Sequence, residues 1–514
     1  MFDKMPQIAP ARVSGLMQAA ERAARAIPPA FPLDATVAVN PFLGQTGEDL
    51  ATAAARLSRV AGIPVTRARA DYAAEIAAGR IGEDDLAAAL EASAWPSKPA
   101  DVASLRAEAQ RAGAAPAALP TVADLAGAAT GTDWSALIDK CVGLWAAGQF
   151  DRGQALWSPA PGLSAYAAWQ AWASRDLTPE IAGLAGFCAH VAEAPDTAER
   201  AILRAADALG ITEDAAETAF HRLLMDLGGW AQHARWLLWQ AELGGGSDAT
   251  LADLLAIRLV WEEALLAHVP QVADHWAETV GAHAAPVTPT PDQVVDAILQ
   301  EAAERAHQRR LATALDGETT GDGRPALQAA FCIDVRSEVY RRALESLSPE
   351  IETIGFAGFF GLPLAHRAPG SDVVEAHLPV LLTPGLTSHS HADEKKERET
   401  RIKARAARAW GRFRQAAVSS FAFVEAAGPL YGAKLVRDAL GMTGPAAKAP
   451  APQLDEALSA EAKADTAATV LGAMSMTKGL GRVVLLLGHG AQVANNPHES
   501  AYHCGACGGY TGEV

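Results

Sequence analysis

The composition of residues 1–285 limits the fold of this sequence more than any other feature, because this stretch is rich in Ala, Leu and Glu. Apolar residues recur in it at the spacing of a helix face, as in Leu203, Ala206 and Leu209. We therefore predict a mainly helical region over residues 1–285. Residues 35–41 are the exception, because their apolar run ends at Asn-Pro and is typical of a short strand.

Residues 286–514 combine helix and strand signals, which predict an α/β core. A helix should begin after Thr290, which is followed by a Pro at the first helical position and by a Gln three residues after the cap. That helix should extend to about residue 315. Two later apolar runs, residues 326–335 and 482–487, are typical of buried strands.

Two charged or low-complexity stretches lie between these strands. Residues 391–414 are rich in charge and typical of an exposed helix. Their basic amphipathic pattern would suit contact with a membrane or an acidic partner, and a solvated helix face explains the same pattern. Residues 443–468 are rich in Ala, Pro and charged side chains, which indicates a mobile connector.

The net charge of −17 and the pI near 5.3 exclude some classes of partner. Phosphate binding needs a concentrated basic surface, so this balance argues against nucleic acid and against simple electrostatic attachment to anionic lipid. No apolar run reaches the roughly 18 residues that span a bilayer, and residues 1–12 lack the apolar core of a signal peptide. We therefore expect a cytoplasmic protein, docked, if at all, on a membrane partner.

The five cysteines are an odd number and sparse for a chain of 514 residues. This usage favours reduced thiols or metal ligands over a disulfide framework. Cys141 and Cys188 lie in helix-like segments, and we interpret both as core residues.

Both predicted strands are followed by side chains that bind metals. Cys332 and Asp334 end the first strand, and residues two apart on a regular strand project to the same face. His489 follows the second strand between two glycines, which permit a close backbone approach. Ligands of open α/β sheets bind outside the carboxyl ends of the strands, where both segments lie. A buried Cys332 also fits an ordinary apolar role.

Residues 498–509 add two His and two Cys among several glycines. Cys504 and Cys507 form a Cys-x-x-Cys pair, which with His498 and His503 is compatible with a separate structural zinc knuckle. Taken by themselves, the residues leave open whether such a knuckle forms or whether this segment completes the site at the strand ends.

Several segments carry a resemblance to known families. Residues 331–338, FCIDVRSE, resemble the Cys-x-Asp-x-Arg motif of β-carbonic anhydrases. Together with four other segments, they resemble the DabA family, the large subunits of the DAB inorganic-carbon transporters: VAVNPFLG (37–44), ETIGFAGFFG (352–361), RFRQAAVSSFAFVE (412–425) and HGAQVANNPHESAYHCGACGG (489–509). The resemblance spans nearly the whole chain and implies an α/β fold with a β-carbonic-anhydrase-like sheet core. It implies one zinc ion, held by Cys332, Asp334, His489 and Cys504.

This set of ligands suggests how the site would work. Four protein ligands describe a closed zinc site, whereas a catalytic zinc keeps a position for water. Asp334 is the ligand expected to leave, because Arg336 can hold its carboxylate in a bidentate pair. Water activated by zinc would then hydrate CO₂ to bicarbonate, with Asp334 steering the proton.

The resemblance also implies a partner and a location. DabA-like proteins pair with a membrane subunit, DabB, that is similar to the ion-translocating antiporter-type subunits of respiratory complex I. A DabA-like chain would therefore be a peripheral protein on the cytoplasmic face of the cell inner membrane, where a cation gradient drives one-way conversion of CO₂ to bicarbonate.

Two departures accompany the resemblance. His377 stands where the family has Cys, and family chains continue well past residue 509, so that we expect a fragment or a shortened chain ending at Val514.

Two other functions fit the same residues. A zinc-dependent hydrolase of esters or amides needs a general base beside the metal, and Glu338 is the near candidate. In a non-catalytic alternative, zinc only joins the two halves of the chain, and the protein is a scaffold subunit of a membrane complex.

Overall fold

The computed structural model describes residues 9–31, 39–151, 160, 162–316, 323–333, 335–356, 364–378, 383–415, 420–440 and 450–488. The chain forms two compact units. The first comprises Met1–Ala30 and Val39–Thr319, and the second comprises Phe31–Ala38 and Thr320–Val514. None of the described helices is long and apolar enough to cross a membrane.

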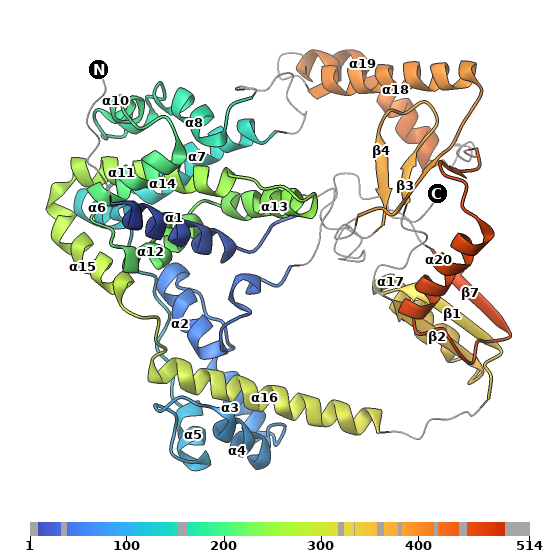
Figure 1. Ribbon diagram of the computed structural model, residues 1–514, viewed down its shortest axis with the longest axis horizontal. Coiled ribbons are helices and arrows are strands. Elements are labelled where there is room, and N and C mark those ends of the chain that lie inside the picture. The colour runs from blue at the N-terminus through green and yellow to red at the C-terminus, as the bar shows by residue number, and fades with distance from the viewer. Residues whose placement is uncertain are drawn as a thin grey trace. The chain divides into compact units, whose positions relative to one another are not determined.

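The described secondary-structure elements of the first unit are all helices (Figure 1). Its helices are α1 (Pro10–Arg25), α2 (Leu50–Ala61), α3 (Arg69–Ala77), α4 (Glu83–Ala92), α5 (Val102–Ala109), α6 (Val122–Thr130), α7 (Trp134–Gln149), α8 (Ala165–Ala173), α9 (Thr178–Ile181), α10 (Phe187–Ala192), α11 (Ala198–Ala208), α12 (Glu213–Met225), α13 (Trp230–Leu243), α14 (Thr250–His268), α15 (Ala273–Ala284) and α16 (Pro291–Leu315), with the 3-10 turns η2 (Leu43–Gln45) and η3 (Pro270–Val272). The predicted helical character is therefore confirmed. The strand expected near residues 35–41 mostly falls outside the described residues, and residues 39–41 are not in a strand.

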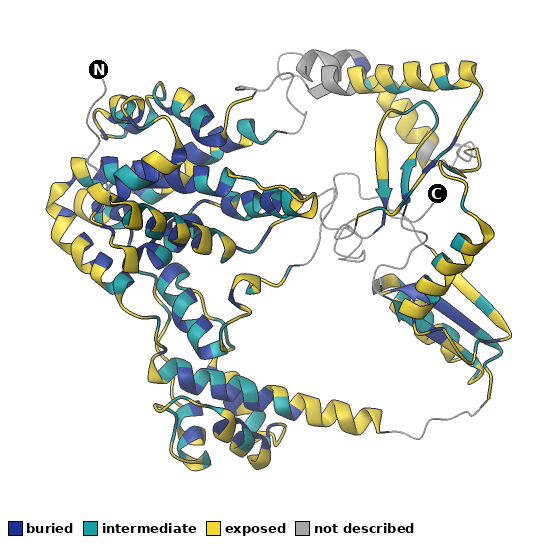
Figure 2. Cartoon of the chain, in the orientation of Figure 1, coloured by how far each residue is buried: buried dark blue, intermediate teal, exposed yellow. Residues whose placement is uncertain are grey.

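Helix α14 is the centre of the larger of two cores in this unit. Apolar residues occur on all its sides, and such a helix is stable only when other helices surround it. It packs against α8, α11, α12 and α13, and its burial is visible in Figure 2. Cys141 of α7 belongs to this core, as predicted, whereas Cys188 of α10 is only half-buried.

Helix α16 is the centre of the second core of the first unit. It also places the end of this unit later in the chain than the sequence predicted. Thr290 caps it, and its hydroxyl accepts the Gln293 N–H while the Gln293 side chain accepts the Thr290 N–H, as the sequence predicted. The helix buries Val294, Ile298 and other apolar residues against α2 to α5. The first unit therefore ends at residue 319 and not at residue 285, because α16 packs with the helices of residues 50–109.

The second unit is α/β. Its elements are β1 (Leu327–Cys332), α17 (Val335–Glu345), β2 (Ile351–Phe356), β3 (Leu364–Arg367), β4 (Val374–His377), β5 (Leu386–His389), α18 (Glu394–Gln415), α19 (Ser420–Ala439), β6 (Gln453–Leu454), α20 (Ala460–Ala473) and β7 (Val483–Leu487). One sheet has the strand order β2-β1-β7, with both pairs parallel. The other has the order β4-β3-β5-β6, with one parallel pair between two antiparallel pairs.

The parallel sheet is covered on two faces by different helices. Ala330 of β1 packs with Met474 and Met476, which follow α20. On the opposite face, the rings of Phe331 and Tyr340 of α17 lie 5.7 Å apart. These contacts fix the direction of each side chain on β1, because neighbouring residues of a strand point to opposite faces.

Three predictions for this unit met different outcomes. The two strands and the exposed helix of residues 391–414 are confirmed as β1, β7 and α18. The prediction that both strands are buried holds for β1 only, because β7 lies at the edge of the sheet formed by the described strands and its residues are exposed or half-buried. The expected connector, residues 443–468, contains β6 and residues 460–468 of α20, a helix that begins after the Ser459 cap. The likeness of this core to β-carbonic anhydrases stays a prediction.

Candidate metal centre

Cys332 is the last residue of the central strand β1, and its side chain is only 1% exposed. It pairs in register with Phe356 of β2. Because side chains alternate along β1, Cys332 lies on the same face as Ala330, which is the face covered by α20. The sequence predicted a buried thiol at the carboxyl end of a strand, and this placement is confirmed.

The strand β7 lies directly beside β1 and parallel to it. Phe331 pairs with Leu487, the last residue of β7. The residues that follow these two are Cys332 and Gly488, so both strands end at the same edge of the sheet. His489 is the next residue of the chain, and it lies outside the described residues. The pairing therefore delivers the chain that leads into His489 to the edge where Cys332 ends.

A hydrogen bond joins the end of β1 to the first turn of α17. The Ser337 hydroxyl, in the first turn of α17, donates a 2.5 Å hydrogen bond to the Cys332 carbonyl. Regular strand geometry thus ends at Cys332, and helix begins at Val335. Asp334, which the sequence analysis expected on the same face as Cys332, lies outside the described residues. Arg336 is in the first turn of α17 and is exposed.

The remaining predicted ligands also fall outside the described residues. These are Cys504 and the alternatives around it: His498, His503 and Cys507. Among the residues that the structure describes, no group of three or more His, Cys, Asp or Glu side chains is placed to hold a metal. The structure therefore describes one of the four predicted ligands, Cys332, together with the backbone on which two others follow.

Glu338, the candidate base of a hydrolase, is engaged by arginines of its own helix. Its carboxylate oxygens lie 3.3 Å from Arg341 and 3.4 Å from Arg342. Arg341 in turn donates to Thr353 of β2. These contacts assign Glu338 to the solvated surface of α17, and they do not favour a general base at the strand edge.

The second sheet carries histidines that the sequence analysis did not group. The His366 ring on β3 lies 2.8 Å through Nδ1 from the Ser388 hydroxyl on β5, and its centroid is 5.8 Å from that of His377. Burial and then the neighbouring His377 lower the pKa of His366. His389 contacts Asp455 after β6. The Ser-His-Ser-His run at residues 388–391 was the available signal, but only strand register shows which residues meet.

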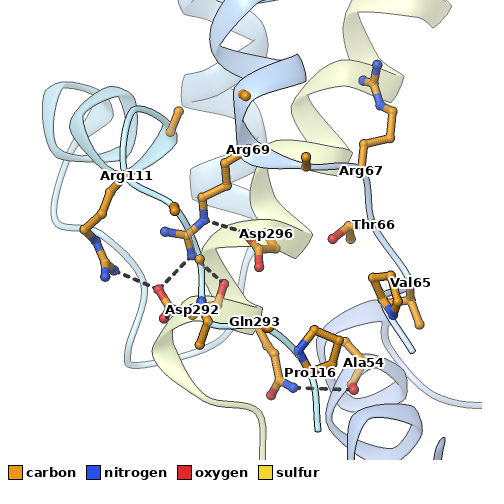
Figure 3. A pocket seen from close by; sticks show the side chains of 18 of the residues that line it. Ala54, Val65, Thr66, Arg67, Arg69, Arg111, Pro116, Asp292, Gln293 and Asp296 are labelled. Carbon is orange, nitrogen blue, oxygen red and sulfur yellow. Dashed lines mark hydrogen bonds and ion pairs between the residues drawn. The ribbon is translucent and has the colours of Figure 1, made fainter. Parts of the chain in front are cut away.

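A cavity of about 920 Å³ lies in the first unit, away from these residues in the sequence. Alanines form much of its wall, and Figure 3 shows Arg69 beside Asp292 and Asp296. Arg69 is almost fully buried and pairs with both carboxylates and with Glu108, while Arg111 pairs with Glu108 and Asp292. These charges satisfy one another, which indicates a structural role in joining α3, α5 and α16.

Comparison with known proteins decides the family of the chain. A family model described as "Probable inorganic carbon transporter subunit DabA" matches residues 20–514. This chain belongs to the DabA family. Relatives that carry the same description are 58% identical over 505 residues in Rhodopseudomonas palustris strain BisB5, 58% over 502 residues in Allorhizobium ampelinum and 57% over 507 residues in Roseobacter denitrificans.

The match to these DabA relatives covers nearly all of this chain but only part of each relative. It covers 97%, 96% and 98% of this chain, but 62%, 62% and 63% of the respective relatives. The chain therefore spans less than two thirds of the length of these curated relatives. No solved structure matches the chain.

Proposed function

We propose that this chain acts in an inorganic carbon transporter, where it binds one zinc ion and converts CO₂ to bicarbonate. One observation carries the proposal: in a chain of the DabA family, the parallel strands β1 and β7 end at one sheet edge with Cys332 and the backbone leading into His489. The printed names of the relatives, which describe a probable inorganic carbon transporter subunit, support the choice of substrate.

The proposed ligands are Cys332, Asp334, His489 and Cys504. Cysteine, histidine and aspartate are the side chains that zinc prefers, and zinc sites usually have four ligands. The buried position of Cys332 fits such a role, because its thiol lies where solvent has little access. When bound, zinc would supply a Lewis acid that lets water lose a proton near neutral pH.

The residues of the β1–α17 turn would position the reacting groups. Asp334 lies in sequence between Cys332 and Ser337, which the hydrogen bond from Ser337 ties together. We assign Asp334, once it has left the metal, the role of accepting and releasing the proton of the reaction. Arg336 is a positioning residue that would hold the Asp334 carboxylate. The N-terminus of α17 carries partial positive charge, which would orient bicarbonate at this edge.

The proposed complex contains a membrane ion-translocating subunit, similar to DabB and to the antiporter-type subunits of complex I. In it, the chain would sit as a peripheral protein on the cytoplasmic face of the cell inner membrane. The word subunit in the names of the relatives supports a complex, and coupling to an ion gradient would make CO₂ conversion one-way.

Metal analysis of matched cysteine variants tests the zinc site. Cys332→Ser should abolish zinc binding by the purified chain. Cys141→Ser is the control, because Cys141 is equally buried at 1% exposure and its pKa, raised to about 11 by burial, keeps it a neutral thiol. Retention of stoichiometric zinc by Cys332→Ser would overturn the proposed ligand set.

Isotope exchange between CO₂ and water separates the proposed function from the alternatives. Exchange of ¹⁸O by the chain together with its membrane partner, lost in Asp334→Ala, is the expected result. Zinc without any exchange would indicate the scaffold alternative. Full exchange activity in Asp334→Ala would refute the role of that carboxylate, and ester or amide hydrolysis without exchange would indicate the hydrolase.

A further inference from the structure

The helices α18 and α19 of the second unit expose an unusual combination of side chains. α18 contains nine Lys or Arg and three Glu among 22 residues, a net charge of +6 in a chain of −17. The two helices are in contact, and the Trp410 indole donates a 2.9 Å hydrogen bond to the Tyr431 hydroxyl (Figure 1). Figure 2 shows that most of their described residues are exposed.

The positive charge of α18 forms a stripe. Arg398, Arg401, Arg405 and Arg408 follow one another at intervals of three or four residues, which places them on one face of the helix. All four are exposed. Within the described part of the chain, Arg401 pairs with Asp372 at 3.4 Å, and the other three form no ion pair. Three guanidinium groups thus face solvent without an ion-pair partner among the described residues.

Exposed apolar side chains occur on both helices. Ile402 follows Arg398 and precedes Arg405 on the adjoining strip of the helix, and it is 58% exposed. On α19, Leu430 and Leu435 are 72% and 70% exposed. Apolar side chains in this number are normally covered, and a basic helix with adjacent apolar residues matches the surface of an anionic bilayer, where phosphates pair with arginine and the boundary accepts apolar groups.

We infer that α18 and α19 form a docking surface for an anionic lipid bilayer. Charge complementarity favours lipid phosphate, because the rest of the chain is acidic and would be repelled by the same surface. The net negative charge of the whole sequence argued against simple electrostatic attachment to anionic lipid. The basic stripe of α18 would allow such attachment in the one orientation that turns α18 towards the bilayer. The inference rests on the proposed membrane location and is independent of zinc.

Vesicle flotation of the 514-residue chain tests this surface. The probes are vesicles of phosphatidylcholine alone and of equal parts phosphatidylcholine and phosphatidylglycerol. The chain should float with the anionic vesicles only, and less so as salt rises, because salt screens exposed charges. The triple variant Arg398→Glu, Arg405→Glu, Arg408→Glu should lower the partition coefficient at least about tenfold.

A matched triple variant controls for net charge. Lys140→Glu, Arg175→Glu, Arg200→Glu changes the charge by the same amount at exposed positions of the first unit, and should leave binding within about twofold. Absence of binding to anionic vesicles, an equal loss in both triple variants, or flotation that requires a partner protein would each overturn the inference. Circular dichroism checks that both variants fold.

A second variant tests the apolar part of the surface. Leu430→Ser with Leu435→Ser should weaken binding to anionic vesicles and leave its salt dependence unchanged, because no charge is altered. Unchanged binding would overturn the insertion of α19. Zinc content, measured on the same samples, should stay as in the wild type, so that a failure of lipid docking is distinguished from a failure of the zinc proposal.

Discussion

Two buried histidines of the first unit should make its stability depend on pH. His221 of α12 and His283 of α15 are 1% and 2% exposed. Burial, reinforced by the positive charge of Arg56 and opposed by Glu217, lowers the pKa of His221 to about 4. Burial, followed by the charges of Arg59 and Arg222, lowers the pKa of His283 to about 4. Both rings are therefore neutral in the folded protein at pH 7.

The sign and size of the effect follow from the difference between folded and unfolded pKa. In the unfolded chain both rings take up protons below pH 6.5, whereas in the folded protein they do so only near pH 4. The contribution is intact above pH 6.5 and is lost as the pH falls from 6.5 to 4. The full loss is roughly 3.4 kcal/mol for each histidine, and about 2 kcal/mol of it has occurred by pH 5.

Urea unfolding followed by tryptophan fluorescence measures this loss in the first unit, because eleven of the twelve tryptophans lie within residues 1–319. The free energy of unfolding should fall by about 4 kcal/mol between pH 7 and pH 5 through these two groups. His221→Leu should remove about half of that pH dependence. No described residue hydrogen-bonds to the His221 ring, so this variant removes little else. His275→Leu, an exposed position on α15, is the control. A His221→Leu protein that keeps the whole wild-type pH dependence would refute the reasoning.

Two further predictions concern buried contacts of each unit. Arg258→Met should destabilise the first unit by roughly 3–5 kcal/mol, because it strands the fully buried Glu262 carboxylate, and Arg258→Met with Glu262→Gln should recover much of that loss in urea unfolding. An equal loss in the single and double variants would contradict this account. Ser337→Ala removes the hydrogen bond to the Cys332 carbonyl and should cost about 1 kcal/mol of stability. It should also weaken zinc binding in a chelator competition, whereas unchanged zinc affinity would show that this turn does not position the ligands.

Sequence alone predicted the elements whose signals are local. The cap at Thr290 identified the start of α16, because Thr, Pro and Gln act within one turn of the chain. The apolar runs identified β1 and β7 as strands, since short continuous runs of apolar residues are typical of strands. The charge of residues 391–414 identified α18 as an exposed helix.

Other predictions depended on contacts between distant residues and were less successful. The end of the first unit moved from residue 285 to 319, because α16 buries its apolar face against residues 50–109. β7 proved to be an exposed edge strand, since burial depends on what lies beside a strand and not on its own composition. The expected connector contains β6 and residues 460–468 of α20, and the residues with which this helix packs on the sheet, Val470 and Leu471, follow the stretch in sequence.

For the candidate metal site, too, some features follow from the sequence and others from the tertiary structure. The sequence by itself determined which residue types are available for a metal, and long matching segments determined the family, because both are properties of residue identity and order. Only the tertiary structure decided that β7 lies parallel to β1, so that Cys332 and Gly488 come to the same edge although 156 positions separate them in the chain. It also decided that β1 ends at Cys332 and that the Ser337 hydroxyl of α17 donates to the Cys332 carbonyl. Pairing of distant strands and the closing of a turn depend on which surfaces meet, and that information is not carried by any one segment.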